Sequence, residues 1–250
     1  MRKIILFVMI LSGLLQTASA QEAKKEEKFR KNTIHINITN PLIFGSGSIV
    51  VGYERILKSK KHSFSINFGV TSFPDFGLIE NDSLKHLNKL KDQSGYNVSA
   101  DYRFYLAKEN KYPAPRGVYI GPYYSYNYFG NRNTWEVKTI AGSTPIESEL
   151  KLNVHTFGLE LGYQFVFGDR ISLDMILLGP GVGAYNFKVG FNNNLSEEAK
   201  QKILNALNGA LSEKFPGYGI IVNEDEFKRT GATDRTTIGY RYMVQLGFRF

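Results

Sequence analysis

The sequence predicts an all-β fold: an eight-stranded antiparallel up-and-down transmembrane β-barrel with short helices in the extracellular loops. Three observations lead to this fold class. The last stretch, 237–250, alternates between one apolar and one mainly polar face, and its length suits a tilted strand that crosses a bilayer, which takes roughly 9–11 residues. Seven further segments alternate in the same way. The connections between them are short and long in turn, as in barrels with both termini on one side of a membrane.

The N-terminus has the features of a secretory signal peptide, residues 1–20. Arg2 and Lys3 give it a positive start, an apolar core follows, and small residues precede a cleavage site after Ala20. We therefore expect export through the Sec pathway, followed by a polar leader, 21–31. No later stretch approaches the roughly 20 apolar residues of a membrane-spanning helix. A membrane location for the mature chain therefore requires a closed barrel, which we assign to 32–250.

Composition narrows the possible functions. The 250 residues carry a formal net charge of +8, but the basic residues are scattered, so no nucleic-acid partner is predicted. Cysteine is absent, and the four histidines lie in different segments without metal-ligand spacing. We therefore predict no metal and no cofactor.

The alternation places the strands in order along the chain. The first strand stops at Asn40-Pro41, and the glycines between Gly179 and Gly183 predict a bulge or bend within the seventh. The predicted strands are 33–39, 49–54, 63–71, 96–106, 118–128, 157–167, 171–187 and 237–250.

The connections provide a test that did not enter the choice of strands. The even connections are short, whereas the odd ones after the first are long, and this parity puts the long loops on the extracellular side. The short turns are 58–61, 108–115 and 168–170, and the long loop insertions are 73–94, 130–150 and 190–236.

The polar faces of the strands distinguish a membrane barrel from its main alternative, a secreted barrel of the lipocalin kind. They are rich in glycine, serine and asparagine, with charges of both signs, which suits a crowded interior better than a solvated surface. We expect these charges to form a paired plug, because unpaired buried charges are costly and eight strands leave room only for side chains. A gated ion path is the alternative. The predicted network is Glu54, Asp101, Arg103, Glu160, Asp174, Arg241 and Arg249.

The apolar faces carry aromatic residues towards the strand ends. Two aromatic girdles around an aliphatic band are typical of proteins that contact membrane lipid at both interfaces. We expect outer-membrane lipid as one partner and, through the C-terminal strand, the barrel-assembly machinery as another, with Tyr242, Leu246, Phe248 and Phe250 as the assembly signal. The periplasmic girdle is Phe104, Phe165, Phe167, Phe248 and Phe250, and the outer girdle is Tyr96, Tyr126, Tyr128, Phe157, Tyr185 and Tyr240.

Several motifs together resemble a family of uncharacterised Gram-negative outer-membrane β-barrels, of the small OmpA-like kind. The resemblance spans 32–250 and implies an outer-membrane barrel, but it brings no activity. The motifs are Asn40-Pro41-Leu42, Tyr53-Glu54-Arg55, Asp101-Tyr102-Arg103-Phe104-Tyr105, Gly117-Val118-Tyr119-Ile120-Gly121-Pro122-Tyr123, Gly162-Tyr163-Gln164-Phe165 and Leu178-Gly179-Pro180-Gly181.

No catalytic constellation is recognisable. His155 is the candidate for a lipid-facing catalytic base, but the His-x-Ser pair of barrel lipid deacylases is absent around it, which favours an interfacial histidine. We therefore predict a structural or surface-binding barrel, with a narrow pore or a lipid-modifying enzyme as alternatives.

The third long loop contains a predicted amphipathic helix, 195–215. Ser196 is a suitable N-cap residue, and Pro216-Gly217 ends the helix. Because Leu84, Leu87 and Leu90 have helical spacing in the first long loop, we expect the two loop helices to pack as an extracellular cap that presents a surface to a ligand or protein. The apolar stripe of the third-loop helix is Ile203, Leu204, Leu207, Leu211 and Phe215.

Overall fold

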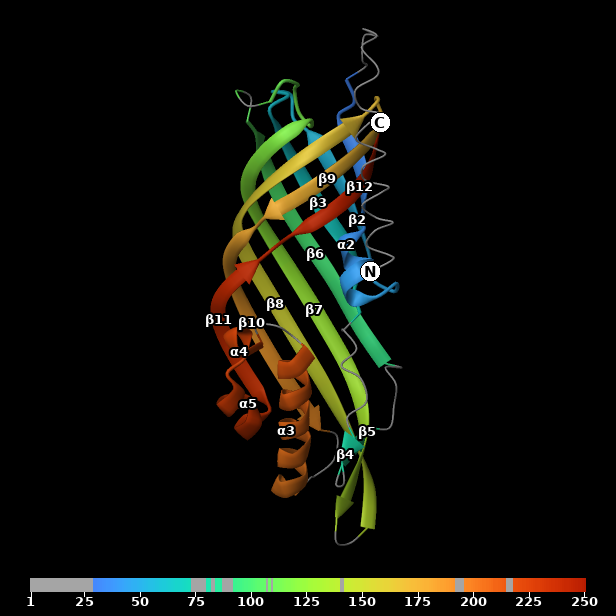
Figure 1. Ribbon diagram of the computed structural model, residues 1–250, viewed down its shortest axis with the longest axis vertical. Coiled ribbons are helices and arrows are strands. Elements are labelled where there is room, and N and C mark those ends of the chain that lie inside the picture. Colours follow the sequence, from blue (N-terminus) through green and yellow to red (C-terminus); the bar gives the residue numbers. More distant parts are fainter. Residues whose placement is uncertain are drawn as a thin grey trace.

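The structure, a computed structural model, describes residues 29–72, 80–81, 84–86, 92–106, 108, 110–139, 142–191, 196–214 and 218–250. The signal peptide and most of the leader lie outside these residues. The chain forms a closed ring of eight antiparallel strands (Figure 1), so the predicted fold class is confirmed.

The ring follows chain order and closes where the last strand pairs with the first. Two further strands, β10 (Pro180–Phe191) and β11 (Ala232–Tyr240), lie beyond the ring and come between its last two strands in the sequence. They pair with each other. In pairing order the ring is β1 (Asn32–Asn37), β2 (Ile49–Ile56), β3 (His62–Val70), β6 (Asp92–Tyr105), β7 (Gly117–Thr139), β8 (Gly142–Phe167), β9 (Ile171–Leu178) and β12 (Met243–Arg249).

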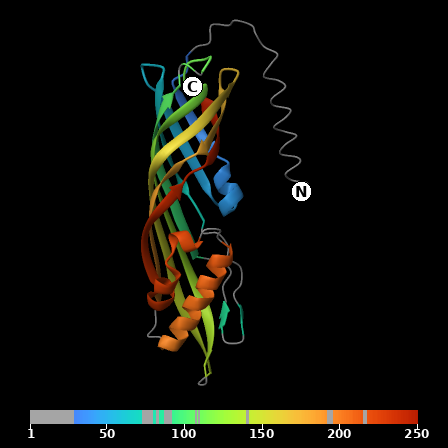
Figure 2. The same cartoon turned by 60° about the vertical axis from the view of Figure 1, so that its left-hand side comes forward.

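The two ends of the barrel differ. The β2–β3, β6–β7 and β8–β9 connections and the C-terminus lie at one end, which we call the turn end (top of Figure 1). At the other end, the helix end, β7 and β8 run far past the ring and meet the remaining small elements (Figure 2). These elements are α3 (Glu197–Lys214), α4 (Tyr218–Ile221), α5 (Glu224–Thr230), β4 (Glu80–Asn81) and β5 (Leu84–His86).

The outer face of the ring, and of the parts of β10 and β11 next to it, carries a belt of exposed apolar side chains, which we call the apolar band. Alternate residues of each strand contribute to it, because successive side chains point to opposite faces. On β7 the band ends near Tyr128, since the next outward residues are Gly130 and Arg132. Its exposed members include Ile34, Ile36, Val51, Phe64, Ile66, Phe68, Phe104, Ile120, Tyr124, Phe157, Leu159, Val182, Ile238, Leu246 and Phe248.

The outer face turns polar beyond the band. In the tall parts of β7 and β8 the outer residues include Arg132 and Glu149, and the buried inner residues are both apolar and polar. These inner residues are Trp135, Ile146, Leu150, Asn131, Asn133 and Ser148. The segment predicted as a loop, 130–150, therefore continues both strands in its described residues, 130–139 and 142–150, which pair with each other and which we call the tall hairpin. The prediction of a loop was wrong because these residues keep their strand pairing although the outer face is no longer apolar.

The barrel closes through a short seam. β1 has six residues, and beyond it the chain turns into the helix α2 (Thr39–Phe44) instead of continuing the wall. The Asn37 side chain starts this helix, since its Oδ1 accepts the N–H groups of Thr39 and Asn40 at 2.8 and 3.0 Å. The Thr39 hydroxyl accepts the N–H of Val244 at 2.8 Å, so α2 is fixed to β12 at the seam. The other edge of β11 pairs with no strand among the described residues.

A β-bulge interrupts the seventh strand at Leu177, two residues before the predicted glycine run, because Leu161 pairs with Leu178 whereas Gly162 pairs with Ile176. The strand then breaks at Gly179, between β9 and β10. Asp174 and Ile176 face inwards before it, whereas Gly183 and Phe187 face inwards after it, so inner positions change from even to odd numbers. Tyr185 therefore belongs to the inner face, and its assignment to the outer aromatic girdle was wrong because the extra residue at the bulge shifts the alternation.

Two further expectations need correction. Leu84 and His86 belong to the strand β5, which pairs with β7, so this segment is not a helix; Leu87 and Leu90 lie outside the described residues. The final stretch, 237–250, is not one continuous strand, because it divides at Arg241 and Tyr242 into β11 and β12.

Candidate functional site

The lumen of the ring is occupied by a cluster of buried charges centred on Arg103. This side chain comes from β6 and has no exposed surface. Its guanidinium lies 2.5 Å from Asp101 and 2.8 Å from Asp174, with Glu54 at 3.6 Å and Glu160 at 3.9 Å. Four strands thus contribute carboxylates to one arginine, which crosses the lumen from wall to wall.

Arg241 forms a second layer on the helix-end side of Arg103. Its Nη1 lies 3.1 Å from Glu160 Oε2 and its Nη2 lies 3.7 Å from Asp101 Oδ2. The Tyr123 ring lies beneath its guanidinium at 5.2 Å, as the Tyr119 ring lies 4.6 Å from that of Arg103. Aromatic faces attract cations, so the tyrosines help to hold both guanidinium groups in place.

Glu54 connects this cluster to four further inner-face residues that the sequence analysis did not include. Ser63 and Tyr105 donate hydrogen bonds to its Oε1 at 2.6 and 2.9 Å. His35 Nε2 and Gln164 Nε2 lie 3.3 and 3.2 Å from its Oε2. Alternation places these residues on the inner face, but only the register between β1, β2, β3, β6 and β8 brings them to one carboxylate.

Arg249 lies apart from this cluster. Its Nη2 donates to the carbonyl of Arg30 at 3.2 Å, and it lines a small hollow at the turn end with Phe29, Tyr112 and Asp169. The structure therefore brings together Glu54, Asp101, Arg103, Glu160, Asp174 and Arg241 from the predicted network and places Arg249 at the rim.

The helix end contains a separate apolar core, which we call the helix-end core. The helix α3 covers the inner face of the tall β7–β8–β10 wall, and Ile203, Leu204 and Leu207 of the predicted stripe are fully buried in it. The side chain of Leu211 and all of Phe215 lie outside the described residues. The core is Phe129, Trp135, Ile146, Leu150, Phe187, Ala199, Ile203, Leu204, Leu207, Tyr218, Val222 and Phe227.

The short helix α5 follows directly from its sequence. Asn223 is its N-cap and accepts the N–H of Glu226 at 3.3 Å, and three acidic residues in the first turn suit the helix dipole. Gly231 ends the helix in the left-handed conformation, and its N–H donates to Phe227 O at 2.8 Å.

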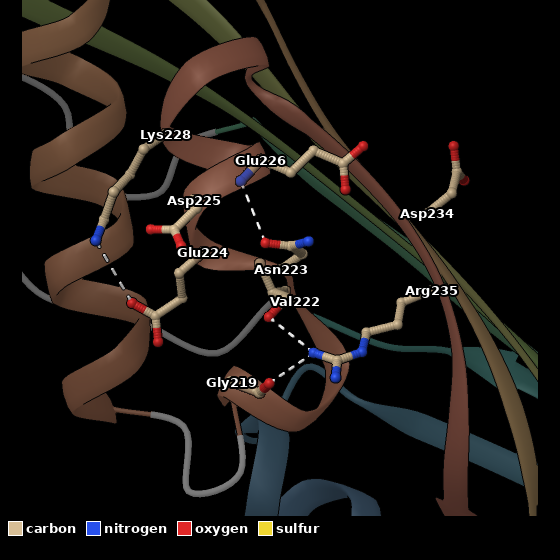
Figure 3. A pocket seen from close by; sticks show the side chains of 9 residues that line it. All are labelled: Gly219, Val222, Asn223, Glu224, Asp225, Glu226, Lys228, Asp234 and Arg235. Atoms are coloured by element: carbon tan, nitrogen blue, oxygen red, sulfur yellow. Dashed lines mark hydrogen bonds and ion pairs between the residues drawn. The ribbon is translucent and has the colours of Figure 1, made fainter.

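A hollow of about 580 Å³ lies between α4, α5 and β11 (Figure 3). Arg235 of β11 donates to the carbonyls of Gly219 and Val222 at 2.8 and 3.4 Å and so fixes α4 to the wall. Glu224 accepts a hydrogen bond from Asn208 of α3 at 2.9 Å, which joins the helices beside this hollow. Burial, and secondarily the nearby carboxylate of Glu224, raises the pKa of the Tyr218 hydroxyl, which therefore stays protonated at neutral pH.

His155 lies on the outer face, where β8 leaves the apolar band. Its Nδ1 shares a hydrogen bond of 2.8 Å with the Tyr124 hydroxyl, and its ring lies 4.5 Å from that of Tyr126. Two tyrosines thus hold the histidine in an interfacial position.

Leu246 and Phe248 are exposed on the outer face of β12, and Tyr242 and Phe250, which flank this strand, are exposed as well. Their role as an assembly signal stays a prediction. Within the described part of the chain, no group of three or more histidine, aspartate or glutamate residues is arranged to hold a metal ion. No described helix is both long and apolar enough to span a membrane.

The fold and the lumen define a small closed β-barrel with a charge-filled interior. No family model matches the chain, and no curated protein is significantly similar to it in sequence. Among solved structures, a major outer membrane protein from Thermus thermophilus is similar, with 11% sequence identity and a TM-score of 0.38 over 88% of this chain and 98% of that chain. At this level of similarity, neither the function nor the assembly of that protein extends to this chain.

Proposed function

We propose that this protein is an outer-membrane barrel that does not conduct and that holds its helix end outside the cell as a binding surface. The apolar band supports the membrane location, because exposed apolar surface of this extent is costly in water and a closed barrel leaves no unpaired edge within the ring. The polar outer face of the tall hairpin supports an aqueous environment for the helix end.

The buried Arg103 cluster is the observation that carries the non-conducting role. Conduction requires a water-filled path, but the side chains of Arg103, Asp101, Glu160 and Asp174 fill the lumen and have almost no exposed surface. Paired charges in this geometry serve as a plug, because the burial of unpaired charges would be costly.

Planar-bilayer recording tests this role. We expect negligible conductance from the wild-type barrel and no stable, ion-selective openings. Arg241→Ser removes one guanidinium from the helix-end layer of the plug and should produce small openings if that layer seals the lumen. Large openings in the wild type would instead support a narrow pore.

The binding role rests on α4 and α5, which line a hollow together with β11, and on α3, which packs beside them; a hollow on a rigid wall is a common arrangement for binding sites. The test is complementation of a deletion strain, scored by envelope sensitivity. A variant in which a Gly-Ser linker replaces 197–230 should reach the membrane but fail to restore the phenotype. Full restoration of the phenotype by this variant would contradict the binding role and support a purely structural barrel.

A further inference from the structure

The outer wall has a second hollow, of about 390 Å³, between β8, β10 and β11. We call it the outer hollow. Its outward side chains are Asn153 and His155 from β8, Ala184 and Asn186 from β10, and Asp234 and Thr236 from β11. Ala184, in the middle strand, has the smallest of these side chains and leaves the space open.

The polar atoms around the outer hollow are held in fixed directions. His155 Nδ1 is occupied by the Tyr124 hydroxyl, and Asn153 Oδ1 accepts the Tyr126 hydroxyl at 2.8 Å. Among the described residues, His155 Nε2 and Asn153 Nδ2 have no hydrogen-bond partner. Asn186 donates to Asp234 Oδ1 and keeps that carboxylate at the edge of the hollow. Two free nitrogen atoms and a carboxylate therefore converge on one space.

The charges around the outer hollow argue against recognition of a phosphate. Arg235 also lines it, but its guanidinium is turned to the carbonyls of Gly219 and Val222. The remaining outward groups are amides, an imidazole, a hydroxyl and a carboxylate, which can donate to and accept from hydroxyl groups in different directions. Such a set suits a hydroxyl-rich ligand, such as a sugar.

The surface next to the outer hollow is apolar. Two residues closer to the ring on the same three strands, the outward side chains are apolar and exposed. They are Phe157 next to His155, Val182 next to Ala184, and Ile238 next to Thr236. A ligand in the hollow would thus have apolar wall on its membrane side and water on the other, which is the environment of a lipid headgroup.

We propose that the outer hollow binds the sugar headgroup of a membrane glycolipid, whose acyl chains lie along Phe157, Val182 and Ile238. This inference rests on the outer-membrane location proposed above, and it adds a specific lipid partner to it. His155 Nε2 and Asn153 Nδ2 contact the sugar hydroxyls, and Ala184 provides the space for the ring.

The test is native mass spectrometry of the full-length mature protein in detergent. The probes are a monoglucosyl diacylglycerol, phosphatidylglycerol and a soluble glucoside. Ala184→Trp fills the hollow. Val51→Trp is the matched control, because Val51 is an outward, exposed residue of β2 that pairs opposite Ile36 and Phe68, away from the hollow. A double variant, Asn153→Ala with His155→Ala, removes the polar groups without adding volume.

We expect the wild type and Val51→Trp to retain the monoglucosyl diacylglycerol in preference to phosphatidylglycerol, and Ala184→Trp and the double variant to retain at least tenfold less. Equal retention by Ala184→Trp and Val51→Trp, or equal binding of phosphatidylglycerol, would overturn the proposal. Equal binding of the free glucoside would overturn the choice of a lipid as its source. Failure of the outer-membrane location is distinguishable, because the wild type would then bind none of the lipids.

Discussion

Single residues determine which partners the buried charged groups in the lumen of this barrel have. Arg103 is in contact with acids from three other strands as well as its own. Glu54 in turn also accepts hydrogen bonds from the uncharged side chains of Ser63, Tyr105 and Gln164. The inward position of each acid could be predicted from alternation. The roles of His35, Tyr105 and Gln164 could not, because their position beside Glu54 depends on the cross-strand register, which is not visible in one sequence.

Removing Arg103 should destabilise the barrel strongly. Arg103→Ala leaves Asp101 and Asp174 buried without their main cation, and breaking one side of a buried ion pair typically costs about 3–5 kcal/mol. Urea unfolding in detergent micelles measures the loss. The control is Arg229→Ala, an exposed arginine of α5, which should change stability by less than about 0.5 kcal/mol. A similar small effect for both variants would contradict the central role of Arg103.

At the scale of elements, the strands approach one another closely wherever glycine replaces a side chain. A Cβ atom added at Gly121 of β7 would lie 1.7 Å from the carbonyl oxygen of Tyr102, whereas one added at Gly190 of β10 would find its nearest atom at 3.9 Å. A side chain at Gly121 would therefore push β6 and β7 apart, whereas one at Gly190 would not disturb the pairing of strands.

Gly121→Ala should consequently destabilise the barrel by about 1–3 kcal/mol, the usual cost of forcing extra volume into a packed site. Because the clash is with backbone, no side-chain rotation relieves it. Gly190→Ala, measured in the same urea titration, should be close to neutral. Equal midpoints for the two alanine variants would show that β6 and β7 can separate without cost.

The helix α3 gives the second prediction at this scale. Leu207 is fully buried in the helix-end core, and truncation of a buried leucine to alanine typically costs about 2–5 kcal/mol. Leu207→Ala should accelerate hydrogen exchange in α3 and α5 while β1, β2 and β3 keep their protection. Asn205→Ala, on the exposed side of the same helix, is the control. Faster exchange throughout the barrel would mean that the helix end and the ring unfold as one unit.

On the scale of the whole molecule, the sequence predicted the ring of eight strands better than the elements that extend beyond it. Eight alternating segments and the parity of the connections were sufficient for the barrel, because the bilayer selects an apolar outer face on every strand. The tall hairpin was missed because its outer residues, such as Arg132 and Glu149, stand beyond the apolar band. A bulge or bend was expected between Gly179 and Gly183 and lies just before this run, at Leu177, but its consequence for Tyr185 depends on the number of extra residues, which composition does not reveal.

Cysteine labelling tests the position of the whole molecule in the membrane. The chain has no cysteine of its own, so single substitutions report cleanly. Ile36→Cys and Leu42→Cys should react slowly with a water-soluble maleimide in reconstituted vesicles, because apolar surroundings suppress the reactive thiolate. Glu149→Cys on the tall hairpin should react fast. Fast labelling at Leu42 alone would place α2 in water and leave the ring in the bilayer.

The short seam at β1 has a consequence for the lipid around the protein. The outward apolar residues of β8 extend from Phe157 to Phe167, about 36 Å along the strand, whereas the six residues of β1 provide about 20 Å. Leu42 of α2, 78% exposed, and Ile43 extend the apolar surface beyond β1 by only one helical turn. The apolar surface of the protein therefore falls short of the hydrocarbon layer, about 30 Å thick, on the β1 side only. Such mismatch is relieved by local thinning of the bilayer or by tilting, at a fraction of a kcal/mol per Å. Lipid beside β1 should accordingly be the thinnest in the ring of lipid that surrounds this barrel.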